Sequence, residues 1–399
     1  MLHDLADPIL VEDEAAFAEL LKDLERHPEI AIDTEADSFF SYREKVCLIQ
    51  ITAGERDYLL DPLSGLDVAP IGRVLADARR VKVFHDGEYD LLLLKREYGF
   101  SFASLFDTRV AASALGEVNP GLANVLQSRF GVELDKSLQR SNWGARPLSQ
   151  RQIAYARLDT HFLLPLMNQQ RPELAKLGRL EVVDGECRRL EQLEPPATGF
   201  DPDEWVRLKG ARVLSPTCRR ALREVFVLRE QISSENDDPP FRVMSNPVLV
   251  EIATRWPRNE AALGAIHGLS WKQVRRFGRR VLEALERASE MEPIRELPQL
   301  RPKDGTGGLS AEQCELYDRL KAWRKGAAER EGFDASLILN RRAMVRIAQD
   351  QPSDPARFRA VDSVQEWQVR RFGESMAQVV RTFQDDLRAG RVELGRRRR

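Results

Sequence analysis

The sequence lacks the cysteine and histidine patterns of several protein classes. Its 399 residues include four cysteines, Cys47, Cys187, Cys218 and Cys314, which lie far apart and form no CxxC pair. This argues against a disulfide framework and against a thiolate zinc site. The five histidines form no HxxxH pair, which argues against a histidine-rich metal site. Metal chemistry in this chain therefore has to use carboxylates.

Long apolar runs and a leader-like beginning are also missing. No stretch approaches the roughly 18–20 apolar residues that a membrane helix needs. The chain starts MLHDLADPILVEDE, which is acidic and has no basic segment followed by an apolar one. We therefore expect a cytoplasmic protein with no membrane partner. Hydrophobic residues make up 42% and charged residues 31%, as in globular proteins, and the length predicts two to four domains.

The small net charge of −2 conceals an asymmetry between the two halves of the chain. Residues 205–399 carry +11, and residues 1–204 therefore carry −13. A basic half beside an acidic half favours a nucleic-acid partner, although two solvated surfaces give the same count. An acidic half binds phosphates poorly unless some of its carboxylates hold divalent cations. The acidic positions are thus the first place to look for chemistry.

The apolar pattern predicts an α/β domain at the N-terminus and helices after it. Short β-branched runs between Pro, Gly or Asp read as strands, and a helix is predicted over Glu88–Tyr98. We expect a mixed sheet from these strands. Residues 171–200 read as one helix and a linker, and beyond Trp205 every element reads as helix. The predicted strands cover residues 29–36, 46–53, 56–61 and 80–86.

The C-terminal half repeats itself with an offset of 95 residues. Arg276-Phe277-Gly278 recurs as Arg371-Phe372-Gly373, while the segment beginning at Trp271 matches the one beginning at Trp367 only if one residue is deleted. Asn246 and Asn340, 94 residues apart, suggest a similar loop deletion. The repeat predicts two copies of an all-α domain of roughly 80 residues. The predicted domains are residues 1–195, 208–290 and 305–390, with a basic tail at 391–399.

Two acids share one face of the first predicted strand. Asp33 and Glu35 are two residues apart, and side chains two apart in a strand point the same way. Unpaired buried charge is costly, so a divalent cation with its preference for oxygen ligands is a suitable neighbour. Alternatively, the strand ends at Ile32 and the acids belong to a solvated turn.

Further acids lie on two later elements. Asp86, Glu88 and Asp90 crowd the junction between a strand and a helix, where capping is the alternative explanation. Tyr155 and Asp159 lie one turn apart on a helix expected to begin near Gln150, with a Ser149/Gln152 capping box. Pro165 is expected to kink or end this helix. A satisfied core pair is the alternative reading of Tyr155 and Asp159.

Taken together, these motifs resemble the DEDD exonuclease superfamily in its tyrosine-bearing branch, and within it the ribonuclease D family. The similarity extends through Leu134–Trp143, Arg146–Ser149, Tyr155–Asp159 and Leu163–Leu166, and the tandem repeat resembles the helicase-and-RNase-D C-terminal (HRDC) domain. Asn142 departs from the pattern, since Asp is common before the Trp. Asp90 is chosen over its acidic neighbours by its spacing of five residues from His85.

The resemblance implies a fold and a mechanism. The fold is an RNase H-like α/β domain with a mixed sheet, followed by two all-α domains, and the activity is metal-dependent 3′–5′ hydrolysis of RNA to nucleoside 5′-monophosphates. Asp33, Glu35, Asp90 and Asp159 are expected to bind two divalent ions, Mg²⁺ or Mn²⁺, since oxygen ligands suit both. Tyr155 is expected to orient the attacking water. The partners implied are tRNA precursors and other structured RNA 3′ ends, with no obligate protein partner.

Two other functions stay open at this level. A DNA exonuclease uses the same chemistry, and only contacts to the 2′-hydroxyl distinguish the substrates. A catalytically inert RNA-binding protein on this fold is the other, and its signature, loss of an acid, is not seen. Among secondary positions, Asp107 reads as a helix cap and Trp143 as packing. Gln50 could reach the substrate or bond to the backbone, and the basic residues 272–280 could line an RNA groove or form a solvated face.

Overall fold

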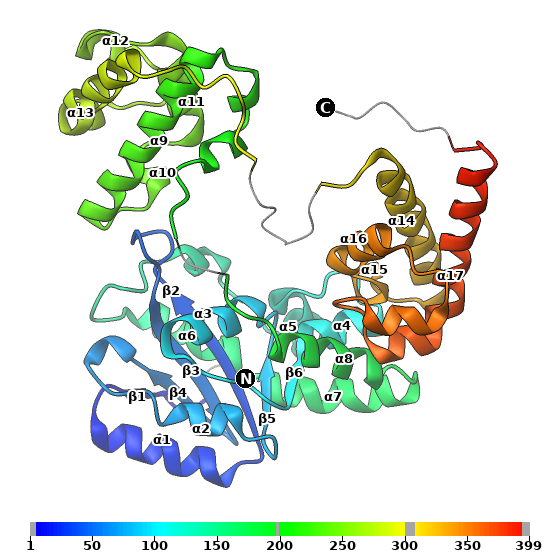
Figure 1. Ribbon diagram of the computed structural model, residues 1–399. Helices are drawn as coiled ribbons and strands as arrows, with labels where there is room; N and C mark the ends of the chain where they lie inside the picture. Colours follow the sequence, from blue (N-terminus) through cyan, green and yellow to red (C-terminus); the bar gives the residue numbers. More distant parts are fainter. Residues whose placement is uncertain (1–4, 197–198, 300–307, 393–399) are drawn as a thin grey trace. The chain divides into compact units, whose positions relative to one another are not determined.

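The computed structural model describes residues 5–196, 199–299 and 308–392 (Figure 1). The predicted basic tail lies outside the described residues from position 393 onward. Contacts divide the chain into two compact units. Unit 1 comprises residues 1–35, 46–195 and 302–399, and unit 2 comprises residues 36–45 and 196–301. Within the described residues, no helix combines the length and apolar character that crossing a membrane requires.

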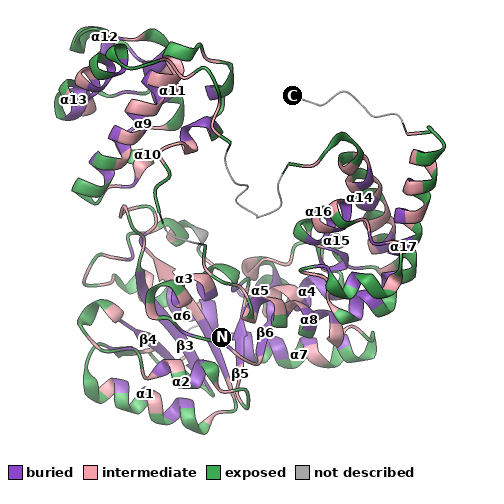
Figure 2. Ribbon diagram, viewed as in Figure 1, coloured by how far each residue is buried: buried purple, intermediate pink, exposed green. Residues whose placement is uncertain are grey.

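Unit 1 contains a six-stranded mixed sheet in the order β1-β4-β3-β2-β5-β6. The β1/β4, β2/β5 and β5/β6 pairs are parallel, while β3 and β4 form an antiparallel hairpin. All eight residues of β3 are buried, and Figure 2 shows the middle of the sheet in the colour of buried residues. The strands are β1 (Ile9–Val11), β2 (Glu29–Ala36), β3 (Val46–Ala53), β4 (Arg56–Leu60), β5 (Val81–Phe84) and β6 (Leu105–Asp107).

Helices pack around this sheet, as the predicted α/β fold requires. Helix α6 packs on β3 and β4, and α7 packs on β5. The helices of this part are α1 (Glu14–Arg26), α2 (Ile71–Ala76), α3 (Glu88–Tyr98), α4 (Thr108–Leu115), α5 (Leu122–Phe130), α6 (Gln150–His161), α7 (Leu163–Lys176) and α8 (Leu180–Glu191). Short 3₁₀ turns cover η2 (Pro62–Ser64) and η3 (Lys136–Arg140).

The second helical domain, residues 308–392 as described, packs against α8 within unit 1. The Arg179 guanidinium donates to the carbonyl of Ala114, 2.8 Å away, and lies 5.2 Å from the ring centre of Phe333. The same group bonds the carbonyl of Glu331. The elements of this domain are α14 (Ala311–Glu331), α15 (Ala335–Ile338), α16 (Arg341–Asp350), η6 (Pro355–Ala360) and α17 (Glu366–Arg388).

Unit 2 is the first helical domain together with the loop that follows β2. The Tyr42 hydroxyl donates to Glu230 at 2.5 Å, and its backbone N–H donates to Asp237 at 3.0 Å. The Arg242 guanidinium lies 4.3 Å from the ring centre of Phe40. The elements are η4 (Glu204–Arg207), η5 (Ala211–Val213), α9 (Pro216–Asn236), α10 (Pro240–Val243), α11 (Asn246–Arg255), α12 (Glu260–Gly264) and α13 (Trp271–Glu290).

The two helical domains repeat at an offset of 95 residues without the two deletions that the sequence suggested. Helices α9, α10, α11 and α13 begin 95 residues before α14, α15, α16 and α17. The capping boxes Ser270/Gln273 and Gln365/Gln368 hold the same offset. Lys272 therefore corresponds to Trp367, and Trp271 to Glu366. The pairing of Trp271 with Trp367 was therefore wrong. It matched two identical side chains, whereas the capping boxes of the two helices align Lys272 with Trp367.

The predicted fold class is confirmed, and several elements differ from the prediction. Strands β1 and β6 were missed, because three residues are too few to show a period. Residues 171–200 hold the end of α7 and all of α8 rather than one helix. Helix α6 ends at His161 before Pro165 is reached, and Pro165 lies in the first turn of α7, where its missing N–H has no helical partner to lose.

Candidate active site

Strand β2 carries two of the predicted acids on one face. The strand continues to Ala36, so the alternative that it ends at Ile32 is wrong. Asp33 and Glu35 are both partly buried, and Thr34 between them is buried. Alternation along the strand places the two carboxylates side by side and Thr34 on the other face.

A buried polar network anchors α6, the helix that carries Tyr155 and Asp159. The Asp57 carboxylate on β4 accepts from the Arg157 guanidinium at 3.0 Å and contacts His161 Nδ1 at 2.8 Å. The Thr52 hydroxyl bonds both Asp57, at 2.8 Å, and Thr160, at 2.9 Å. These bonds tie one side of α6 to β3 and β4. With the capping box at Ser149, they fix which face of α6 turns toward β2.

Three carboxylates from these two elements converge. Oxygens of Asp33, Glu35 and Asp159 all lie within 4.8 Å of one another. Burial, followed by repulsion from neighbouring carboxylates, raises the pKa of Asp33 and of Asp159 well above the usual range. The same causes raise the pKa of Glu35 to about 9. Such a cluster favours a positive charge at its centre.

Asp90 is buried beside this cluster and is held by Thr34. Its carboxylate accepts a hydrogen bond from the Thr34 N–H at 3.1 Å and another from the Thr34 hydroxyl. Burial raises the pKa of Asp90 to about 6, although the Thr34 bonds work in the opposite direction. The other acids of this segment face elsewhere: Asp86 pairs with Arg109, and Glu88 pairs with Arg189. Thr34 was missed in the sequence, although its position between the two acids of the motif was a signal.

Tyr155 lies at the edge of the carboxylates and of a small pocket. Burial and then the charges of Asp159, Glu35 and Asp33 raise the pKa of its phenol, and a hydrogen bond with Gln139 acts against this. The hydroxyl therefore stays protonated at neutral pH. Sequence reasoning did not single out Gln139. The pocket, about 160 Å³ in volume, is lined by Gly121, Leu122, Ala123, Asn124, Leu134, Gln139, Tyr155 and Asp159.

Contacts assign structural roles to two of the secondary positions that the sequence singled out, Asp107 and Trp143. Asp107 caps α4, since its carboxylate accepts from the N–H groups of Arg109 and Val110, as predicted. Trp143 is buried, with its ring centre 6.0 Å from that of Tyr155, so it packs as predicted. Gln50 is fully buried, and neither polar atom of its amide has a partner among the described residues, so it does not bond the backbone.

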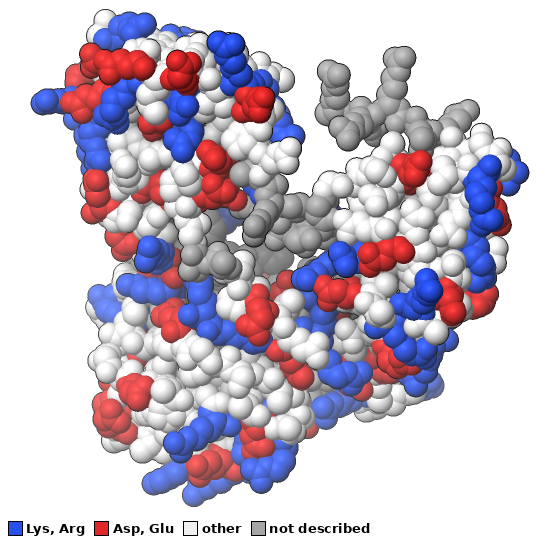
Figure 3. Space-filling view, viewed as in Figure 1, with Lys and Arg blue, Asp and Glu red and all other residues white. Residues whose placement is uncertain are grey.

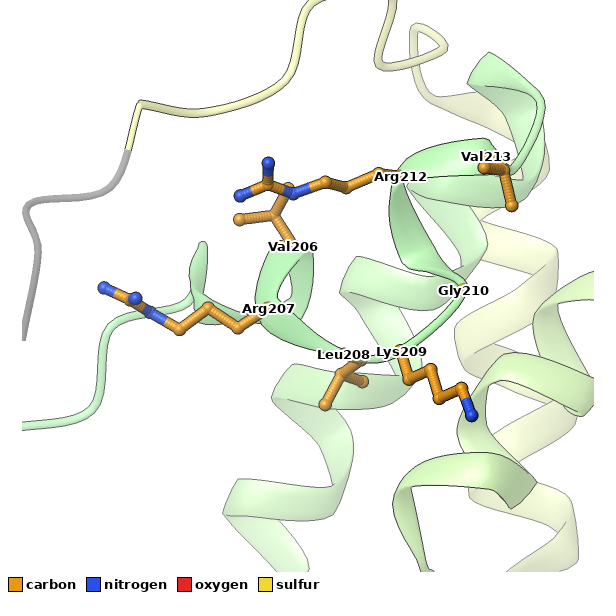
Figure 4. Close-up of a pocket in the computed structure, with 7 residues that line it drawn as sticks. All are labelled: Val206, Arg207, Leu208, Lys209, Gly210, Arg212 and Val213. Atoms are coloured by element: carbon orange, nitrogen blue, oxygen red, sulfur yellow. The ribbon is translucent and has the colours of Figure 1, made fainter. Parts of the chain in front are cut away.

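Another hollow, of about 440 Å³, lies in the first helical domain along residues 206–213 (Figure 4). Arg207 and Arg212 extend toward one side of it, whereas Lys209 points away from them (Figure 4). No carboxylate lines this hollow. It therefore offers no metal ligands, and its cations do not converge on one point.

The carboxylate cluster fits divalent metal ions. Its ligand atoms are hard oxygens, as Mg²⁺ and Mn²⁺ prefer. The raised pKa values give the physical reason, because each carboxyl is costly to ionise without a nearby cation. Divalent-metal dependence follows from the family and from this cluster.

Comparison with known proteins gives two matching family models. A model described as 3′–5′ exonuclease matches residues 8–175. The HRDC domain model matches twice, at residues 218–285 and 313–380. The first match contains all five predicted site residues, and the two others fall in the two helical domains.

Similar whole proteins agree with these models. A ribonuclease D of Gluconacetobacter diazotrophicus is 31% identical over 98% of this chain and 95% of its own length. A ribonuclease D of Sphingobium indicum is also 31% identical, over 82% of this chain and 84% of its own. The crystal structure of Escherichia coli RNase D, described as an exoribonuclease involved in structured RNA processing, superposes with a TM-score of 0.67 at 25% identity, covering 94% of this chain and 99% of that one.

Proposed function

Because the chain belongs to the ribonuclease D family, we propose that it trims the 3′ ends of structured RNA, chiefly tRNA precursors. The chain is a 3′–5′ exoribonuclease of this family. The convergence of Asp33, Glu35 and Asp159 beside Asp90 is the observation that supports assigning this activity to specific residues.

The proposed roles follow the geometry of the carboxylates. Asp33 stands next to the three other acids and would bridge two divalent ions. Glu35 and Asp159 would complete the shell of one ion, and Asp90, steadied by Thr34, would serve the other. Bound there, the two ions would stabilise the attacking and leaving oxygens of an in-line displacement and acidify a bound water.

Tyr155 is proposed to orient the attacking water. Its phenol is a poor base, because burial and then the surrounding carboxylates raise its pKa and keep it protonated. Gln139 would hold the hydroxyl in place through the bond between them. The hydroxyl can then donate to or accept from a water molecule without gaining or losing a proton itself.

The substrate assignment rests on relatives and on charge. The E. coli relative is described as processing structured RNA, and residues 205–399, which include the two helical domains, carry a net charge of +11. A DNA exonuclease of the same superfamily remains the second candidate, because the carboxylates act on either backbone. A cytoplasmic location stays a prediction.

The test is hydrolysis of labelled nucleic acid. End-labelled tRNA precursor and DNA of the same sequence are incubated with the protein and Mg²⁺, Mn²⁺ or EDTA, and the products are identified. We expect nucleoside 5′-monophosphates from the RNA 3′ end, and none with EDTA. Equal cleavage of DNA would favour the second candidate.

The site assignment is tested by amide substitutions. We expect Asp33→Asn, Glu35→Gln, Asp90→Asn and Asp159→Asn each to remove most hydrolysis, because each removes an oxygen charge that holds a metal. RNA binding in EDTA should survive, and so should folding, since a repelling carboxylate is lost. Asp86→Asn is the control and should retain activity, because Asp86 pairs with Arg109 on the surface. Near-normal turnover by Asp33→Asn would refute the two-metal assignment.

A further inference from the structure

The duplicated helical domains place the same helix face in two different settings. Helices α13 and α17 correspond residue by residue from their capping boxes onward. In both, the glutamine at the third position also donates to two carbonyls of a short helix earlier in the same domain: Gln273 to Arg242 and Val243 of α10, and Gln368 to Leu337 and Ile338 of α15. Sequence differences between the corresponding faces of α13 and α17 therefore reflect what each face contacts, and not a difference in fold.

In the second helical domain this face is covered by protein. Trp367, at the second position of α17, is 4% exposed. Its ring nitrogen packs so close to Gly185 on α8 that an added Cβ there would lie 2.5 Å from it. Arg370, one turn later, forms an ion pair with Glu181 on the same helix. This face of α17 therefore packs against α8 of the nuclease domain.

In the first helical domain the equivalent positions are basic and exposed. Lys272 and Arg275 are exposed, and neither has an ion pair or side-chain hydrogen bond within the described part of the chain. Arg279, a further turn along, pairs with Glu283 of its own helix and is 88% exposed. Spaced i, i+3 and i+7, the three cations form one stripe. It runs for about 10 Å along the helix.

An aromatic ring stands at the beginning of this stripe. Trp271 is 56% exposed, yet one edge of its ring packs on Gly264, where an added Cβ would come within 2.7 Å. The ring is therefore held in place with part of its surface open. The second copy has Glu366 at this position, paired with Arg359, and Glu374 in place of Arg279. The equivalent face there carries two acids and one Arg.

Net charge follows the same division. Residues 208–290 contain 15 Lys or Arg against 10 Asp or Glu, whereas residues 305–390 contain 14 against 13. The excess of +5 in the first domain, against +1 in the second, is concentrated in α13. Cations that follow a strand's phosphates, beside an aromatic ring on which a base stacks, make up the usual surface for single-stranded nucleic acid.

We propose that Trp271, Lys272, Arg275 and Arg279 form the surface by which the first helical domain holds single-stranded RNA next to the segment being trimmed, while the equivalent face of the second domain serves only to dock on α8. This inference rests on the proposed function, since RNA is the polyanion that the chain degrades. It assigns binding to one copy of the repeat and architecture to the other.

The test compares two triple variants of the full chain by RNA binding in EDTA, which prevents cleavage. The stripe variant is Lys272→Gln, Arg275→Gln and Arg279→Gln. The control, Lys321→Gln, Lys325→Gln and Arg388→Gln, removes three exposed cations from the second helical domain. Binding of oligouridine is measured between about 50 and 200 mM salt. The stripe variant should reduce the slope of log K against log salt by about 2, or about 0.7 per lost phosphate contact, and the control should not.

The tryptophan gives a second, independent readout. Trp271→Ala should weaken oligouridine binding about five-fold or more, with an unchanged salt slope, because stacking involves no counterion release. Trp271→Phe should restore much of the affinity. Melting temperatures near that of the wild type would show that the exposed substitutions leave the fold intact.

The outcomes separate this inference from the proposed function. Equal slopes for the two triple variants would overturn the RNA surface, and so would a stripe variant that changes self-association and not RNA affinity. Cleavage of a short RNA with Mg²⁺ is measured in parallel. Wild-type cleavage with equal slopes refutes the surface alone, whereas absence of RNA cleavage by the wild type refutes the proposed function.

Discussion

At the scale of single residues, burial turns ordinary carboxyls into a site for cations. Burial is the main cause that raises the pKa of Asp33, Glu35 and Asp159, and the carboxylate of Asp159 raises the pKa of Asp33 and of Glu35 further. Thr34 and Gln139 are the supporting residues, since one bonds Asp90 and the other bonds Tyr155. The supporting contacts decide which acids face inward, because Asp86 and Glu88, close to Asp90 in sequence, are instead paired with arginines.

Tyr155→Phe tests whether the phenol acts in the chemistry. We expect hydrolysis to slow by about 10²-fold or more, within the range for groups that position or exchange a proton. RNA and metal affinity should change little, because the ring still packs against Trp143. Single-turnover rate and melting temperature are measured on one preparation. A hydroxyl that only fills a core hydrogen bond would instead cost about 1 kcal/mol of stability and leave the rate unchanged.

The imidazole of His85 is expected to make the folded chain less stable in acid. Burial lowers the pKa of this imidazole to about 4, while the unfolded value is near 6.5. Neutral His85 thus contributes stability that is complete above pH 6.5 and is lost as the pH falls toward 4, by up to about 3 kcal/mol. The measurement is denaturant unfolding of wild type and His85→Asn from pH 7 to 4. Subtracting the two curves removes the opposite contribution of the carboxyls, and a constant difference would contradict the shifted pKa.

At the scale of elements, two helices with different partners set the arrangement of the site and of its surroundings. Helix α6 brings Tyr155 and Asp159 to β2 because Asp57 binds Arg157 and His161 behind it. Helix α8 provides the surface on which the second helical domain packs. The loop after β2 packs instead with the first helical domain, through Tyr42 and Phe40.

Two glycine substitutions test the contact between α8 and the second helical domain. Alanine in a helix interior is ordinarily more stable than glycine by about 0.5–1 kcal/mol, and Gly326→Ala on α14 should show this gain, since its Cβ meets only Arg330 at 3.5 Å. Gly185→Ala should instead destabilise the chain, because its Cβ would lie 2.5 Å from the Trp367 ring. Thermal unfolding of both variants is the measurement. Equal gains would show that Trp367 does not pack there.

At the scale of the whole molecule, the two halves of the sequence differ in net charge. In the view of Figure 3, Lys and Arg side chains are interspersed with Asp and Glu. The net balance nevertheless differs, with +11 over residues 205–399 and −13 over residues 1–204. The acidic half holds the carboxylates proposed to bind cations, and the positive charge of the basic half is expected to attract phosphates.

Removing residues 205–399 tests this division. We expect weaker RNA binding with a flatter salt dependence, by about 0.7–0.9 in slope for each lost phosphate contact. Trimming of a tRNA precursor should fall further than that of a very short strand, because a short strand reaches few contacts beyond the active site. Circular dichroism of the shortened chain is the control for folding. Identical salt slopes for the two chains would mean that the helical half does not bind phosphates.

The sequence by itself determined the fold class, the repeat and the family. The short β-branched runs at residues 29–36 and 46–53 and the capping box at Ser149 are local patterns, and they predicted β2 and β3 with the bounds that the structure has, and the beginning of α6. The offset of 95 residues and the acidic motifs were equally readable, because each is a pattern of residue types that can be compared along the chain without knowing which side chains meet.

Tertiary structure alone decided which side chains meet and which copies diverge. No local pattern shows that Thr34 binds Asp90, since 56 residues separate them, or that Gln139 reaches Tyr155. Strands as short as β1 and β6 exist only through their partners β4 and β5. The same helix face is exposed at Lys272 and buried at Trp367 because α8 covers one copy. Burial against a distant element is a property of the folded chain, and it is this burial that distinguishes a dock from an exposed cationic surface.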